Sequence, residues 1–326
     1  MDLSVKYMGL ELKSPLIIGS SGLTNSVEKV KELEQFGAGA VVLKSLFEEQ
    51  IIFEAEAAGK QNEYDYPEAL DYIKSYAKDE SVNTYLKLIE DCKKETNIPI
   101  IASVNCLSDG EWLNFAKKME TAGADALELN VSLLPTDMDK TSAENEKLYF
   151  NIVEQVRDVI KIPIALKMSH YSAGLANLIR TLSWTKKIDA FVLFNRYYNP
   201  DIDINTMKIT SSGVFSTPND IAASLRWVAA LSDEIKTNIS ASTGVHSGGD
   251  VVKQLLAGAN TVQTVSAIYK HGPSYVKTMI EELEAWMAKH NFNTIEDYRG
   301  TVNYKNVKNP VAFERVQFMK YFGGIE

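Results

Sequence analysis

Cysteine is scarce in this chain, where only Cys92 and Cys106 occur among 326 residues. Two thiols cannot form the disulfide framework of a small secreted protein, and they do not supply the repeated cysteine spacing of a structural zinc site. We therefore expect a protein of the reducing cytoplasm that has no structural disulfide.

Histidine and long apolar runs are equally sparse. The four histidines, His170, His246, His271 and His290, are scattered, and none has a second histidine or a carboxylate at metal-ligand spacing. No stretch approaches the roughly 18 apolar residues that a membrane-spanning helix needs. The sequence thus predicts no metal site and no membrane partner.

Positive charge is in deficit, because 34 Lys and Arg residues stand against 43 Asp and Glu residues and give a formal net charge of -9 at pH 7. An acidic surface repels polyanions, so we expect no nucleic-acid partner and a small-molecule partner instead. The hydrophobic content of 45% and the chain length suffice for the core of one large α/β domain over residues 1–326.

Short apolar runs rich in β-forming residues recur along the chain, and amphipathic stretches with helical spacing separate them. Their nearly continuous apolar character is typical of parallel strands that are buried on both faces. The eight runs begin at Pro15, Ala40, Pro99, Ala126, Pro163, Ala190, Thr237 and Thr261. This alternation predicts a (β/α)8 TIM barrel rather than an open doubly wound sheet.

Three further segments lie outside this alternation. Residues 47–65 follow the second predicted strand and residues 197–215 follow the sixth, so both insertions start at a strand's C-terminal end, where barrel enzymes build sites and lids. The N-terminal stretch LSVKYMGLELKSP alternates apolar and polar residues around Gly9 and predicts a β-hairpin at the bottom of the barrel.

In a barrel, the last residues of all strands meet at one mouth. A lysine at the end of an apolar strand is costly to bury unless it meets an anion or an electron-rich ring, so Lys44 and Lys167 mark a site most clearly. The alternative is a lysine that reaches out to solvent. The polar or small residues predicted at the mouth are Ser20, Ser21, Gly22, Lys44, Ser45, Asn105, Asn130, Ser132, Lys167, Asn195, Ser242, Thr243, Gly244, Val265 and Ser266.

The stretch STGVHSGGD follows the seventh predicted strand and opens a helix. In many barrels the loops after strands seven and eight bind phosphate through backbone N–H groups. Thr243, Gly244, Val265 and Ser266 would form such a phosphate site. An ordinary glycine-rich turn is the alternative.

In order and spacing, these strand-end residues resemble the dihydroorotate dehydrogenases, most closely the soluble class 1 enzymes. The likeness runs through LSVKYMGLELKSP, SSG, GAGAVVLKS, ELNVS, PIALK, ISASTGVHSGGD, LLAGANTVQ and SAIYKHGP. It implies an FMN-containing (β/α)8 barrel that oxidises dihydroorotate to orotate in pyrimidine biosynthesis, and it suggests a homodimer.

The resemblance also implies roles for single residues. Lys44, Asn130 and Asn195 would contact the substrate, and Lys44 and Asn130 would take part in catalysis. Lys167 would place positive charge where the reduced flavin becomes negative. The implied FMN contacts are Ser20, Ser21, Gly22, Lys44, Ser45, Asn130 and Lys167, with the phosphate on Thr243, Gly244, Val265 and Ser266.

The stretch ELNVSLLPT departs from the family pattern at the catalytic base. Leu133 stands where the family has a Cys or Ser base, and Pro135 stands at a second Asn position. Neither side chain accepts a proton, and we identify no base in this stretch. Substitute bases are Cys106, His170 and Tyr197, and Cys106 ranks first because a thiol has suitable chemistry. A small buried hydrophobic side chain is the alternative for Cys106.

Two more departures from the family pattern leave the identity of the substrate open. The loop after the second strand retains only Asn62 of the family's substrate loop, and Arg196 follows Asn195 where a small hydroxyl residue is expected. An FMN oxidoreductase for another cyclic amide or unsaturated compound is therefore one alternative. A flavin-binding paralogue without activity is another.

Overall fold

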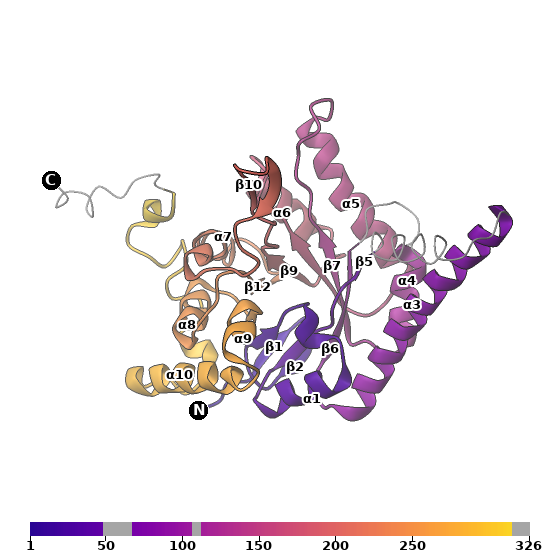
Figure 1. Ribbon diagram of the computed structural model, residues 1–326. Helices are drawn as coiled ribbons and strands as arrows, with labels where there is room; N and C mark the ends of the chain where they lie inside the picture. The colour runs from indigo at the N-terminus through magenta and orange to yellow at the C-terminus, as the bar shows by residue number, and fades with distance from the viewer. Residues whose placement is uncertain (48–66, 106–111, 315–326) are drawn as a thin grey trace.

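The computed structural model describes residues 1–47, 67–105 and 112–314, and for residues 47, 67–79 and 112 it describes the backbone alone. A ring of parallel strands forms the centre, with helices around it (Figure 1). The strands of the ring are β3 (Leu16–Ile18), β4 (Ala40–Val42), β6 (Ile100–Asn105), β7 (Ala126–Val131), β8 (Ile164–Met168), β9 (Ala190–Leu193), β12 (Asn238–Ala241) and β13 (Thr261–Thr264).

The order of strands around the ring is β4-β3-β13-β12-β9-β8-β7-β6, and the pairing of β4 with β6 closes it. The short strand β5 (Leu46–Phe47) adds to the far end of β6. This closed ring confirms the predicted (β/α)8 TIM barrel. Every residue of β3, β4, β7, β8 and β9 is buried, as their continuous apolar character predicts.

Helices connect successive strands of the ring. The helices are α1 (Val27–Gln35), α3 (Pro67–Glu95), α4 (Trp112–Thr121), α5 (Ser142–Val159), α6 (Leu175–Trp184), α7 (Ile221–Leu231), α8 (Gly248–Ala257), α9 (Ser266–His271) and α10 (Tyr275–His290). Short 3-10 turns complete the chain as η1 (Gly22–Thr24), η2 (Pro218–Asp220), η3 (Ile295–Asp297) and η4 (Pro310–Phe313).

Glycine ends three of the helices before the next strand begins. Gly37, Gly123 and Gly258 have φ angles of 99°, 95° and 111°. Glycine occupies this left-handed region without the steric cost that a Cβ atom would bring. The turns GAG, GAD and GAN therefore mark a repeated helix stop that the sequence alone predicts.

A hairpin of β1 (Val5–Tyr7) and β2 (Leu10–Leu12) precedes the barrel. The backbone N–H of Met8 in its turn donates a 2.8 Å hydrogen bond to Oδ1 of Asn238, the first residue of β12. Because that contact lies at the N-terminal end of a ring strand, the hairpin sits at the bottom of the barrel, opposite the mouth.

A second hairpin, formed by β10 (Pro200–Asp203) and β11 (Lys208–Ser211), lies within the connection from β9 to α7. It projects beyond the C-terminal ends of the strands in Figure 1. Its cross-strand pair Ile202 and Ile209 is 66% and 80% exposed. Most of the other predicted insertion, residues 48–65, lies outside the described residues.

Candidate active site

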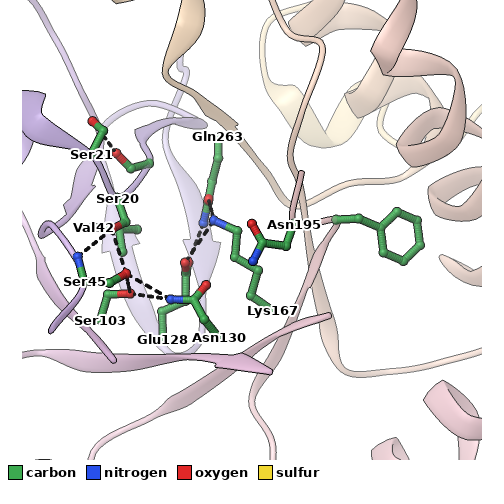
Figure 2. Close-up of polar contacts among 12 residues, drawn as sticks. Ser20, Ser21, Val42, Ser45, Ser103, Glu128, Asn130, Lys167, Asn195 and Gln263 are labelled. Carbon is green, nitrogen blue, oxygen red and sulfur yellow. Dashed lines mark hydrogen bonds and ion pairs between the residues drawn. The ribbon is translucent and has the colours of Figure 1, made fainter. Parts of the chain in front are cut away.

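Four polar side chains from neighbouring strands form a hydrogen-bonded chain at the mouth (Figure 2). The hydroxyl oxygen of Ser45 lies 2.9 Å from that of Ser20 and 2.8 Å from that of Ser103. The Asn130 amide Nδ2 donates to Ser45 Oγ at 3.0 Å and to Ser103 Oγ at 2.9 Å. These bonds fix the Asn130 amide so that its carbonyl oxygen points away from the serines, and it remains available to a ligand.

A buried ion pair lies beside this chain. Lys167 Nζ is 3.2 Å from Glu128 Oε1 and donates to Gln263 Oε1 at 3.3 Å, while Gln263 Nε2 donates to Glu128 Oε2 at 2.7 Å. Glu128 is 1% exposed and Lys167 is 8% exposed. Since each charge meets an opposite charge and further hydrogen bonds, Lys167 can remain a buried cation inside the ring.

The sequence reading missed Ser103, Glu128 and Gln263. Glu128 belongs to ELNVSLLPT, so that stretch does contain a carboxylate, which is paired with Lys167; that no group of the stretch is the catalytic base stays a prediction. Side chains two positions apart on a strand point to the same face. Glu128 therefore shares the inner face of β7 with Asn130, and a carboxylate in an apolar run was a usable indication.

A cavity of about 230 Å³ opens at the ends of β8, β9, β12 and β13. Lys167 and Asn195 line it together with the four residues of the predicted phosphate site. The structure thus brings these parts together, although they lie far apart in the chain. The predicted residues that line the cavity are Ser20, Lys167, Asn195, Ser242, Thr243, Gly244, Val265 and Ser266.

Gly244 is the position where the cavity wall tolerates no side chain. Its φ angle is 77°, and a Cβ atom would lie 2.0 Å from the backbone nitrogen of Ile221. Thr243 has the same positive φ, which is uncommon for a β-branched residue, and its hydroxyl donates to Phe194 O at 3.0 Å. The turn is therefore closely built around backbone groups, as a phosphate-binding turn requires.

Other predicted contacts lie near the cavity but outside its lining. Ser21 caps η1, where its hydroxyl oxygen accepts from Leu23 N at 3.2 Å. Gly22 faces Tyr269, since a Cβ atom there would lie 2.7 Å from the tyrosine hydroxyl. Lys44 is half-buried and its backbone N–H donates to Thr24 O at 3.3 Å.

The substrate-side residues form a second polar group. The amide of Asn195 donates to the hydroxyl of Ser132, which joins the ends of β7 and β9. Leu133, at the family's base position, is half-buried and packs against the apolar core. Cys106 lies outside the described residues, and so does Asn62.

His170 and Tyr197 lie beside this group in an aromatic stack. The ring of Tyr171 is 4.3 Å from His170 and 5.1 Å from Tyr197, measured between centroids. Burial lowers the pKa of His170 and raises the pKa of Tyr197. In the described part of the chain, His170 Nδ1 and the Tyr197 hydroxyl are buried without a hydrogen bond of normal geometry.

The described residues contain neither a candidate metal centre nor a membrane-crossing helix. No group of three or more His, Cys, Asp or Glu side chains there is arranged to hold a metal ion. Among the same residues, no helix combines the length and the apolar character needed to cross a membrane. A larger cavity of about 920 Å³ lies between α6, α7 and η4, but none of the predicted site residues lines it.

Comparisons with known proteins agree with this geometry. Residues 2–287 match the family model described as "Dihydroorotate dehydrogenase". The catalytic subunit of dihydroorotate dehydrogenase B (NAD(+)) from Thermoplasma volcanium is 28% identical over 309 residues, which cover 92% of this chain and 98% of the relative. Its counterpart from Thermoplasma acidophilum is 26% identical over 308 residues, with the same coverage of 92% and 98%. The chloroplastic dihydropyrimidine dehydrogenase (NADP(+)) from Arabidopsis thaliana is 26% identical over 326 residues, which cover 92% of this chain and 76% of the relative.

Proposed function

We propose that this chain, which belongs to the dihydroorotate dehydrogenase family, oxidises dihydroorotate to orotate with bound FMN. The chain is an oxidoreductase of a flavin-dependent family that acts on a CH–CH bond. One observation carries the proposal: Lys167, Asn195 and the predicted phosphate turn line a single cavity at the mouth of the barrel.

The residues of the mouth fit FMN. Gly244 packs against the backbone of Ile221 in a left-handed conformation, and its turn lines the cavity, where backbone N–H groups would bind a phosphate. The first turn of α9, beginning at Ser266, leaves backbone N–H groups without partners inside the helix. Thr243, Gly244, Val265 and Ser266 would hold the phosphate, and Ser20, Ser21, Gly22, Lys44, Ser45, Asn130 and Lys167 would hold the ring system.

FMN supplies the hydride acceptor when it is bound. Lys167 would keep a positive charge beside the bound ring system, and the bonds to Glu128 and Gln263 hold its ammonium group in place. A fixed charge needs no reorganisation during the reaction, which is the condition for effective electrostatic stabilisation.

Asn130, Asn195 and Lys44 would bind the substrate. A dihydropyrimidine ring carries alternating C=O and N–H groups. Both N–H groups of Asn130 already donate to Ser45 and Ser103, so its carbonyl oxygen would accept from a ring N–H, while the Asn195 amide, which donates one N–H to Ser132, keeps one donor and its acceptor. The Asn130 amide is already oriented by Ser45 and Ser103, so it would meet the substrate without losing rotamer freedom.

Cys106 remains our proposed proton acceptor, with His170 and Tyr197 as alternatives. The lowered pKa of His170 keeps its imidazole neutral near pH 7, so it is able to accept a proton. The raised pKa of Tyr197 keeps its phenol protonated, which favours a hydrogen-bond donor over a base.

A second candidate substrate is another cyclic amide. Leu133 at the base position favours it, and one relative is named a dihydropyrimidine dehydrogenase. A flavin-binding paralogue without activity would keep the cavity but lack turnover. The three alternatives differ in what reduces the bound flavin.

We also propose a homodimer in which the hairpin of β10 and β11 takes part. Its side chains Ile202, Ile204, Met207 and Ile209 are 66%, 84%, 85% and 80% exposed. Exposed apolar groups gathered on one projecting element are typical of an interaction surface.

The decisive experiment is anaerobic mixing of the purified yellow protein with dihydroorotate, followed at about 450 nm, where oxidised flavin absorbs. Rapid bleaching supports the dehydrogenase. A yellow protein that bleaches with a dihydropyrimidine but not with dihydroorotate has the second activity. A protein that carries no flavin after reconstitution with FMN would contradict the proposal that FMN is the cofactor.

A further inference from the structure

Arg196 carries a cationic group whose charge has no carboxylate partner in the described part of the chain. It follows Asn195 at the end of β9 and is half-buried. Its guanidinium donates from Nη1 to Val214 O at 2.8 Å and from Nη2 to Gly213 O at 3.3 Å. A guanidinium has five N–H donors, so these two bonds leave three donors for another acceptor.

The described residues that line the cavity with Arg196 include one further cation, Lys167, and no acidic side chain. The charge of Lys167 is offset by Glu128 behind it. The charge of Arg196 is not offset, because backbone carbonyls supply only partial negative charge. A partly desolvated cation on a cavity wall is costly unless the cavity receives an anion.

The segment that holds Arg196 also contacts the predicted phosphate site. Two residues beyond Val214, the N–H of Ser216 donates to Ser266 Oγ at 2.9 Å, and Lys270 Nζ donates to Ser216 O at 3.2 Å. Two residues of chain span at most about 7 Å. The carbonyl of Val214 that binds the Arg196 guanidinium therefore lies within about 7 Å of the residue that bonds to Ser266, and Arg196 and Ser266 both line the cavity.

We propose that Arg196 is a ligand of the cofactor's phosphate monoester and makes the site select FMN over riboflavin. This inference rests on the proposed flavin cofactor and names a residue outside the phosphate turn. A guanidinium matches a phosphate with two parallel N–H···O bonds, which a small hydroxyl residue at this position could not provide. Arg196 would thus add a charged side-chain ligand to the backbone donors of the predicted phosphate site.

The test compares FMN with riboflavin, which lacks the phosphate. Protein freed of flavin would be titrated with each, and the dissociation constant followed by flavin fluorescence, for the unmodified chain, Arg196→Gln and Arg196→Lys. We expect Arg196→Gln to weaken FMN binding about 10- to 100-fold and riboflavin binding less than about 2-fold. Arg196→Lys keeps the charge without the planar fork, so its loss of FMN affinity should be smaller. Arg180→Gln removes the same charge on α6, outside the cavity, and should leave both constants unchanged.

Each contrary outcome has a distinct meaning. An equal loss of affinity for FMN and for riboflavin would show that Arg196 only holds residues 213–214 in place. That result would overturn the proposal. An unchanged dissociation constant for FMN together with weakened orotate binding would show that Arg196 binds the substrate's carboxylate. That result would also overturn the proposal. If the unmodified chain binds neither flavin, the proposed cofactor falls first and this inference with it. Thermal unfolding of each variant shows whether a loss of affinity reflects a loss of fold.

Discussion

The carboxylate of Glu128 lies 3.2 Å from the ammonium group of Lys167, and both are almost completely buried. Gln263 bonds to both partners, so the pair joins β7, β8 and β13 across the interior of the barrel. The lysine that the sequence marks as costly to bury therefore has a counter-ion already in place. The flavin would meet a charge that the protein has fixed beforehand.

Removing the carboxylate should destabilise the fold. We expect Glu128→Gln to lower the free energy of unfolding by about 3–5 kcal/mol, because it leaves Lys167 as an unpaired buried cation. Chemical denaturation measures this. The matched control is Glu281→Gln at the exposed pair with Lys277, which should cost less than about 1 kcal/mol. Similar losses at the two sites would contradict the buried pair's role.

Removing the cation should slow the reaction, and because it leaves Glu128 as an unpaired buried carboxylate it should also destabilise the fold. We expect Lys167→Met in the flavin-loaded protein to slow flavin reduction by about 10²–10³, the usual loss when a preorganised charge is removed. Stopped-flow absorbance under anaerobic conditions gives the rate. A rate within a factor of about two of the unmodified enzyme would remove Lys167 from the chemistry.

The proton acceptor can be identified by comparing two variants. We expect Cys106→Ala to slow flavin reduction by dihydroorotate about 10²–10⁴-fold, the range for loss of a general base. His170→Asn should retain most of the rate if the thiol is the base. The reverse pattern would assign the role to His170.

Burial of His170 predicts a stability that depends on pH. Its folded pKa is lower than the ordinary value of 6.5, so the unfolded chain binds its proton first as the pH falls. The free energy of unfolding should therefore decrease from about pH 6.5 down to the folded pKa. In His170→Gln this decrease should be shallower, whereas the contribution of His246 remains in both proteins. Denaturation between pH 5 and 8 gives the two slopes, and identical slopes would show that His170 is not desolvated.

A double substitution in the hairpin of β10 and β11 tests the proposed homodimer. Ile202 and Ile209 face each other across β10 and β11, so changing both to Asp places charges on one face. We expect sedimentation velocity to show monomers, with no loss of thermal stability because both side chains are exposed. Thr210→Asp, one residue along β11 and on the opposite face, is the control. A dimer that persists in the double variant would locate the interface elsewhere.

Much of the fold was determined by local sequence pattern. Continuous apolar runs form strands buried on both faces, and glycine at positions such as Gly37 and Gly258 ends the preceding helices because those residues adopt positive φ. The order and spacing of the strand-end motifs were sufficient to identify the family. Lys167, Asn195 and Gly244 were predicted at the mouth because parallel strands in a barrel end together.

Only the tertiary structure decided which of these residues touch. Gln263 and Glu128 are 135 positions apart, and their contact exists only because the ring closes. Likewise, Ser216 contacts Ser266 and Arg196 contacts Gly213 through one loop whose path no local pattern specifies. Periodicity records which face a side chain occupies, whereas partners across the barrel depend on register and closure, which arise from packing of the whole chain.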